Sequence, residues 1–127
     1  MNKNSGCGCS CGKSVTLIFP CSGAADTGEI ADRAARSFAR SGCAGMSCLA
    51  GVGANMSGFI ASAKGADRLL VVDGCSVDCA LKTLAERGVT ENIEHIRVTD
   101  LGFEKGKAPA DDERVAVVVA AMKGKIS

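Results

Sequence analysis

The sequence predicts an α/β fold, in which an open and mostly parallel sheet of four strands carries helices on both faces. Short apolar runs rich in Val, Leu and Ile alternate with longer segments of helical periodicity. Such strand–helix repeats imply parallel strands joined by right-handed crossovers. The apolar residues are mostly small, with four Phe and no Trp or Tyr, which suits helices packed closely on a sheet. We therefore expect three layers.

The first half of the chain is expected to hold two strands and two helices. Residues 15–19 are apolar and β-branched, as in a buried strand, and Pro20 closes it. Asp26 or Thr27 can cap the next helix, which ends at Gly42. A short strand is predicted over 46–50, then a loop over 51–53 and a helix over 54–64.

The second half repeats this alternation. Residues 68–73 form the clearest strand of the chain, and a helix over 76–87 ends at the glycine that follows it. A fourth strand is predicted over 94–99. The β-branched segment 111–122 is compatible with strand or helix, and the two aspartates that open it favour helix. The expected sheet is Rossmann- or flavodoxin-like, with strand order 2-1-3-4.

Length and composition predict a flexible cysteine-rich tail over residues 1–13 and one α/β domain over 14–127. No signal-peptide core or membrane-length apolar stretch occurs, so a cytoplasmic location is expected. Thiols stay reduced there, and the eight cysteines then point to metal binding or redox chemistry. A net charge of +1 and few aromatic residues argue against nucleic-acid binding.

Four cysteines are expected at one edge of the sheet. Cys21 and Cys75 each lie two residues beyond a strand, and Cys48 lies in or near the end of the short second strand. Cys79 is placed one helical turn after Cys75, on the same face. Because ligands of such sheets bind at the carboxyl ends of the strands, these sulfurs are predicted to form a thiolate site.

The start of the helix after Cys75 favours negative charge and therefore thiolate, which is both a metal ligand and a nucleophile. Zinc is the expected occupant, and an iron–sulfur cluster is an alternative. A closed site of four cysteines would be structural, whereas three cysteines with an open position could be catalytic. A thiol redox or sulfur-transfer enzyme using Cys75 and Cys79, with Cys21 as another resolving thiol, is the competing function.

Four stretches of the chain resemble the DGC-domain family, named for its Asp-Gly-Cys motif. They are 71–80, which contains Asp73-Gly74-Cys75, together with 19–23, 48–54 and 99–102. The resemblance covers residues 15–107 in order. It implies zinc bound through four cysteines, which fall here at Cys21, Cys48, Cys75 and Cys79. Together with the placement of these cysteines at one edge of the sheet, it leads us to expect a role in metal handling or sensing. It implies a metal rather than a reaction, so the sequence does not decide whether the chain is an enzyme.

Other residues carry weaker predictions. Asp73 could form hydrogen bonds to the ligands of the site or carry a proton. Gly53 and Asn55 could bind an anion at a helix start. In the tail, Cys7, Cys9 and Cys11 could bind a soft metal. The single histidine, His95, is expected on the surface, and Cys43 is expected to be a small buried residue.

Overall fold

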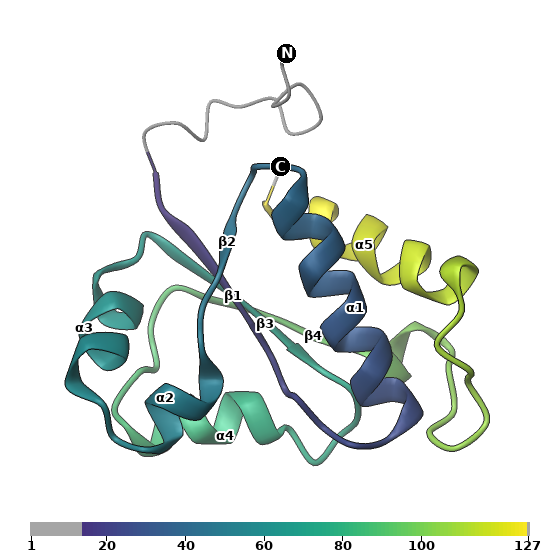
Figure 1. Ribbon diagram of the computed structural model, residues 1–127, viewed down its shortest axis with the longest axis horizontal. Coiled ribbons are helices and arrows are strands. Elements are labelled where there is room, and N and C mark those ends of the chain that lie inside the picture. The colour runs from purple at the N-terminus through teal and green to yellow at the C-terminus, as the bar shows by residue number, and fades with distance from the viewer. Residues whose placement is uncertain (1–13, 127) are drawn as a thin grey trace.

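The computed structural model describes residues 14–126 and confirms the predicted α/β architecture (Figure 1). All four strands are parallel and lie in the order β2-β1-β3-β4, the predicted order 2-1-3-4. The strands are β1 (Thr16–Pro20), β2 (Gly45–Met46), β3 (Arg68–Asp73) and β4 (Ile93–Arg97). Their carboxyl ends therefore meet at one edge of the sheet.

Helices cover both faces of this sheet and give the three expected layers. The helices are α1 (Asp26–Arg40), α2 (Leu49–Gly53), α3 (Ser57–Gly65), α4 (Cys79–Glu86) and α5 (Asp112–Ile126), with a 3₁₀ turn, η3 (Val98–Leu101). Side chains of a strand point alternately to its two faces. Accordingly, Leu70 and Val72 pack under α1 and α5, while Leu69 and Val71 pack under α2, α3 and α4.

Three predictions for the region after α1 were wrong. The second strand is only two residues long and ends before Cys48, and the segment expected as a loop over 51–53 belongs to α2. The following helix begins at Ser57 rather than at residue 54. A two-residue strand gives too short a pattern for alternation to reveal, and the apolar residues Leu49 and Val52 are buried as one side of a short helix.

Two helix starts also differ from the prediction. The residue before α1 is Ala25, which offers no side-chain cap, so neither Asp26 nor Thr27 caps this helix. The helix predicted from residue 76 begins only at Cys79. The last segment is a helix, as favoured, and extends to Ile126. No helix within the described residues is long and apolar enough to cross a membrane.

Candidate functional site

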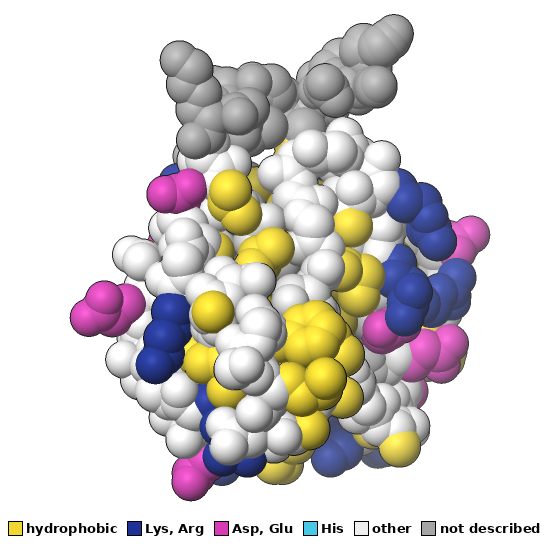
Figure 2. Space-filling model, turned by 60° about the vertical axis from the view of Figure 1, so that its left-hand side comes forward, with side chains coloured by type: hydrophobic (Ala, Val, Ile, Leu, Met, Phe, Trp, Pro, Cys, Tyr) yellow, Lys and Arg dark blue, Asp and Glu magenta, His cyan; other side chains and the backbone are white. Residues whose placement is uncertain are grey.

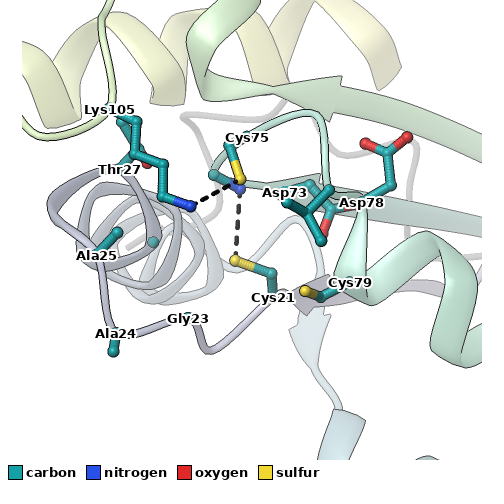
Figure 3. A pocket seen from close by; sticks show the side chains of 13 residues that line it. Cys21, Gly23, Ala24, Ala25, Thr27, Asp73, Cys75, Asp78, Cys79 and Lys105 are labelled. Carbon is teal, nitrogen blue, oxygen red and sulfur yellow. Dashed lines mark hydrogen bonds between the residues drawn. The ribbon is translucent and has the colours of Figure 1, made fainter.

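Three of the four predicted cysteines line one pocket at the carboxyl edge of the sheet (Figure 3). This cavity, which we call the thiol pocket, has a volume of about 290 Å³ and contains Cys21, Cys75 and Cys79. They come from the end of β1, the turn after β3 and the first residue of α4. The start of α1 and Lys105 complete its wall. Chain segments far apart in sequence thus deliver thiols to one place.

Cys21 is held at the end of β1 by both its backbone and its sulfur. Its amide donates to the carbonyl of Val72 at 3.0 Å, which extends the β1–β3 ladder by one residue. Its Sγ accepts from the amide of Gly74 at 3.4 Å. An amide donor of this kind is complementary to the charge of a thiolate.

The Asp-Gly-Cys turn presses directly on the first turn of α1. A Cβ on Gly74 would lie 2.7 Å from the amide nitrogen of Gly28 and 2.8 Å from the carbonyl carbon of Thr27. A Cβ on Gly28 would lie 2.6 Å from the carbonyl oxygen of Gly23. Glycine is therefore needed at both positions, because any side chain would push α1 away from the cysteines.

Lys105 reaches Cys75 from a distant loop. Its Nζ lies 3.5 Å from the Cys75 Sγ. The loop is fixed by the carboxylate of Asp26, which accepts from the amides of Gly106 at 2.9 Å and Ala108 at 3.0 Å. These two backbone hydrogen bonds hold the pKa of Asp26 below its usual value. The first residue of α1 thus fixes the loop that places the Lys105 ammonium group beside the Cys75 thiol.

Asp73 determines where α4 begins and so where Cys79 lies. This aspartate, 1% exposed, accepts from the amides of Ala80 at 2.7 Å and Leu81 at 3.2 Å. It does for α4 what a capping residue normally does, although it lies five residues before the usual position. The intervening chain turns back through Asp78 in the left-handed conformation, with φ 58°. Cys75 therefore lies in a turn, and the expectation that both cysteines open one helix was wrong.

A cluster of charged side chains, which we call the charged cluster, supports this turn from the β4 side. It consists of Asp73, Asp78, His95 and Arg97. His95 Nε2 lies 2.8 Å from Asp73 Oδ2 and 3.7 Å from Asp78 Oδ1. Arg97 donates to both oxygens of Asp78, at 2.7 and 2.8 Å. His95 is therefore an internal partner, not the surface residue that the sequence suggested.

The Asp78–Arg97 contact has an electrostatic consequence. The hydrogen bonds from Arg97 hold the pKa of Asp78 below its usual value, against the opposing effect of burial. The same contact raises the pKa of Arg97. Ligand atoms of Asp73, Asp78 and His95 lie within 4.8 Å of one another, a spacing that a metal could use. Because amides, His95 and Arg97 already occupy these carboxylates, the arrangement is a self-sufficient structural network.

Cys48 lies in a neighbouring hollow rather than in the thiol pocket. It precedes α2, and its Sγ accepts from the amide of Gly51 at 3.3 Å, which caps that helix. The hollow, of about 400 Å³, also includes Pro20 and Ser22, the two neighbours of Cys21. Figure 2 looks onto the side that carries α2 and α3 and shows hydrophobic side chains gathered there. The two cysteine environments are thus separated by the turn at the end of β1.

The sulfurs are near one another without forming a closed ligand set. Within residues 14–126, no three cysteine sulfurs lie within 4.8 Å of one another. Sulfurs around one tetrahedral zinc lie roughly 4 Å apart. Rotation of a cysteine between staggered wells moves its sulfur by roughly 3 Å, so side-chain rotation can close part of this difference.

The remaining candidates lie elsewhere. Gly53 is the last residue of α2 and Asn55 follows it, and the Gly53 carbonyl accepts from Arg87 at 2.7 Å. Neither belongs to the lining of the thiol pocket. Cys43 is 8% exposed and packs in the core beneath α1, as expected. The tail cysteines Cys7, Cys9 and Cys11 fall outside the described residues.

Lys105, Arg97 and the role of His95 were not predicted from the sequence. Lys105 lies in a loop with no motif, and its position depends on bonds to Asp26. His95 and Arg97 share a signal that was available, because charged residues at alternate positions near the end of a strand point to the same face and edge.

Comparison with known proteins gives a consistent result. The model of the DGC domain matches residues 17–122. One relative is the anaerobic and virulence modulator AnvM of Pseudomonas aeruginosa, which is 30% identical over 91 residues. This alignment covers 72% of the present chain and 69% of AnvM. No solved structure gives a significant match.

Proposed function

Because the chain belongs to the DGC-domain family, we propose that it is a regulatory metal-binding protein whose thiol pocket holds zinc. The ligands in this proposal are Cys21, Cys75 and Cys79, with Cys48 as the fourth. One observation carries the proposal: three thiols from separate elements line a single pocket. Chance placement of free cysteines does not favour such convergence at the edge where parallel sheets bind ligands.

The surroundings of the thiols suit a zinc–thiolate centre. Four thiolates around Zn²⁺ leave a net charge of −2, which needs nearby donors or positive charge. The amides of Gly74 and Gly51 already donate to sulfur, and the ammonium group of Lys105 lies beside Cys75. Hydrogen bonds of this kind orient and tune metal ligands. Zinc itself would supply a redox-inert link between the sulfurs.

Closure of the site would couple metal binding to the shape of the carboxyl edge. Cys48 would have to give up the Gly51 amide and turn past the end of β1 toward the other sulfurs. Zinc would then tie the start of α2 to β1 and α4. A relative, AnvM, is named an anaerobic and virulence modulator. A metal-dependent change of this surface would give the chain a means of regulation.

The decisive experiment measures zinc per chain in protein purified without added metal. Every sample carries serine at Cys7, Cys9 and Cys11, so that the tail cannot contribute ligands. We expect about one equivalent of zinc per chain. Each of the substitutions Cys21→Ser, Cys75→Ser and Cys79→Ser should lower the affinity for zinc at least tenfold. Ser76→Ala, an exposed neighbour of Cys75, is the matched control and should retain the metal. Less than half an equivalent, unchanged on zinc addition, contradicts the proposal.

The contact between Lys105 and Cys75 favours a second function, thiol–disulfide exchange in metal-free protein. The Cys75 thiolate would attack one sulfur of a substrate disulfide and expel the other as a thiolate. Cys79 or Cys21 would then attack the mixed disulfide, which releases reduced substrate and leaves an intrachain disulfide. If this function holds, Lys105→Met slows alkylation of Cys75 by iodoacetamide several-fold. An unchanged rate counts against it.

A further inference from the structure

Helix α1 has 15 residues, and its first turn has no side-chain cap. The N-cap residue is Ala25, and the first helical bond runs from the Glu29 amide to the Ala25 carbonyl at 2.9 Å. The amides of residues 26, 27 and 28 therefore have no carbonyl partner inside the helix. One of them, Thr27, donates to Asp26 Oδ1 at 2.7 Å. The residues before the helix, Gly23 to Ala25, are small and line the thiol pocket.

Thr27 provides the second observation. Its side chain is fully buried and lines the same pocket. Its Oγ1 is the one buried side-chain nitrogen or oxygen in residues 14–126 without a hydrogen-bond partner. Buried polar groups are nearly always paired, because an unpaired one carries its full desolvation cost. An unpaired buried hydroxyl on a residue that lines a pocket at a helix start indicates a missing hydrogen-bond partner.

Asp73, Asp78 and Lys105 are the charged side chains that line the pocket, and of these Lys105 is the one without a counter-ion within residues 14–126. Lys105 reaches over the start of α1 toward Cys75 (Figure 3), and within residues 14–126 it forms no ion pair with a carboxylate. The nearby acids are already engaged: Asp26 by loop amides, Asp73 by α4 and His95, and Asp78 by Arg97. The groups left over are the ammonium of Lys105, the hydroxyl of Thr27 and the amides of residues 26 and 28, and all of them can donate.

We propose that the thiol pocket contains a site for a small oxyanion, bound by the start of α1, the Thr27 hydroxyl and Lys105. Helix starts bind such anions through their free amides and the helix dipole. A tetrahedral oxyanion has enough oxygen atoms to accept from all three kinds of donor at once. The volume of about 290 Å³ suits a free anion better than a nucleotide. The anion lies beside Cys75, and the site does not require zinc.

The test uses the full chain, metal-free and reduced, in a chloride buffer of low ionic strength. Calorimetric titration with inorganic phosphate should give saturable binding of one anion per chain. Lys105→Met should weaken it about tenfold or more, as expected for loss of a charge-assisted hydrogen bond. Lys123→Met removes the same charge from an exposed position on α5 and should leave the affinity unchanged. Binding that does not saturate, or equal weakening in both variants, overturns the site.

Thr27→Val supplies an independent readout, because it keeps the shape of the side chain. It should weaken phosphate binding several-fold and, without phosphate, raise the Tm, since it removes an unpaired buried hydroxyl. A lowered Tm with unchanged phosphate affinity would show that the hydroxyl has another role and contradict the proposal. Amide chemical-shift changes should centre on residues 24–28 and 105, and changes centred elsewhere overturn it. A nucleoside monophosphate that binds more tightly than inorganic phosphate would refute a site for a free anion.

Discussion

The two sides of the carboxyl end of β3 differ in how their polar groups are satisfied. On the β4 side, in the charged cluster, each carboxylate has a partner: Asp73 has two amides and His95, and Asp78 has both guanidinium bonds of Arg97. On the α1 side, in the thiol pocket, Thr27 is unpaired and Lys105 faces a sulfur. Polar side chains that hydrogen-bond to one another stabilise the fold, whereas those without a partner can bind a ligand.

This difference assigns distinct roles to the two halves of one loop. Cys75 and Cys79 line the thiol pocket, and Asp73 and Asp78, which line it too, have their carboxylates bound within the charged cluster. The carboxylates fix the turn and the start of α4, and the cysteines then project to the other side. Substitutions in the charged cluster should therefore lower stability, and substitutions in the thiol pocket should change binding.

The largest loss of stability is expected for Asp73→Asn. The amide cannot accept from Ala80, Leu81 and His95 together, and it places an unpaired NH₂ against backbone amides in the core. We expect the free energy of unfolding to fall by about 2–4 kcal/mol, as for other breaks in buried polar networks. Urea denaturation measures this change.

Asp100→Asn is the matched control for this substitution. Asp100 is 64% exposed and pairs with Arg97 only at 3.5 Å, so its loss should cost less than about 0.5 kcal/mol. If the two variants were equally stable, Asp73 would not anchor α4 and the comparison between the two sides would fail.

A smaller loss of stability, present near neutral pH and vanishing in acid, is expected for Arg97→Met. Arg97 holds the pKa of Asp78 below the ordinary value of 3.8, so this pair stabilises the fold above that pH. The contribution is lost as the pH falls through the lowered pKa of the folded state. In Arg97→Met the pKa of Asp78 is no longer depressed, so stability should fall less steeply below about pH 4.

Denaturant midpoints between pH 3 and pH 7 test this expectation. Part of the acid loss should remain in the variant, because the pKa of Asp26 is lowered by loop amides rather than by Arg97. If stability fell as steeply with decreasing pH in the variant as in the wild type, Arg97 would not be the cause of the lowered pKa of Asp78.

The architecture could be predicted from the sequence, because it depends on patterns within single segments. The strand Arg68–Asp73 and the parallel order follow from apolar runs and from helices of crossover length. The gathering of Cys21, Cys75 and Cys79 follows as well, since parallel strands end at the same edge.

The polar detail could not be predicted because it depends on register and on distant loops. His95 meets Asp73 only because β4 aligns Asp73 with Arg97 and Val71 with His95. Lys105 reaches the pocket only because Asp26 binds the amides of residues 106 and 108. Cys48 was expected in or near the end of a strand, and the actual strand has two residues and ends at Met46. No local periodicity encodes these contacts.

X-ray absorption at the zinc edge of the loaded protein tests most directly whether the thiol pocket or the charged cluster binds metal. The sample should carry serine at Cys7, Cys9 and Cys11. We predict a first shell dominated by sulfur at about 2.3 Å, with three or four scatterers. A shell of only nitrogen and oxygen at about 2.0–2.2 Å, retained when Cys75 is serine and lost when His95 is alanine, would place zinc in the charged cluster and contradict this prediction.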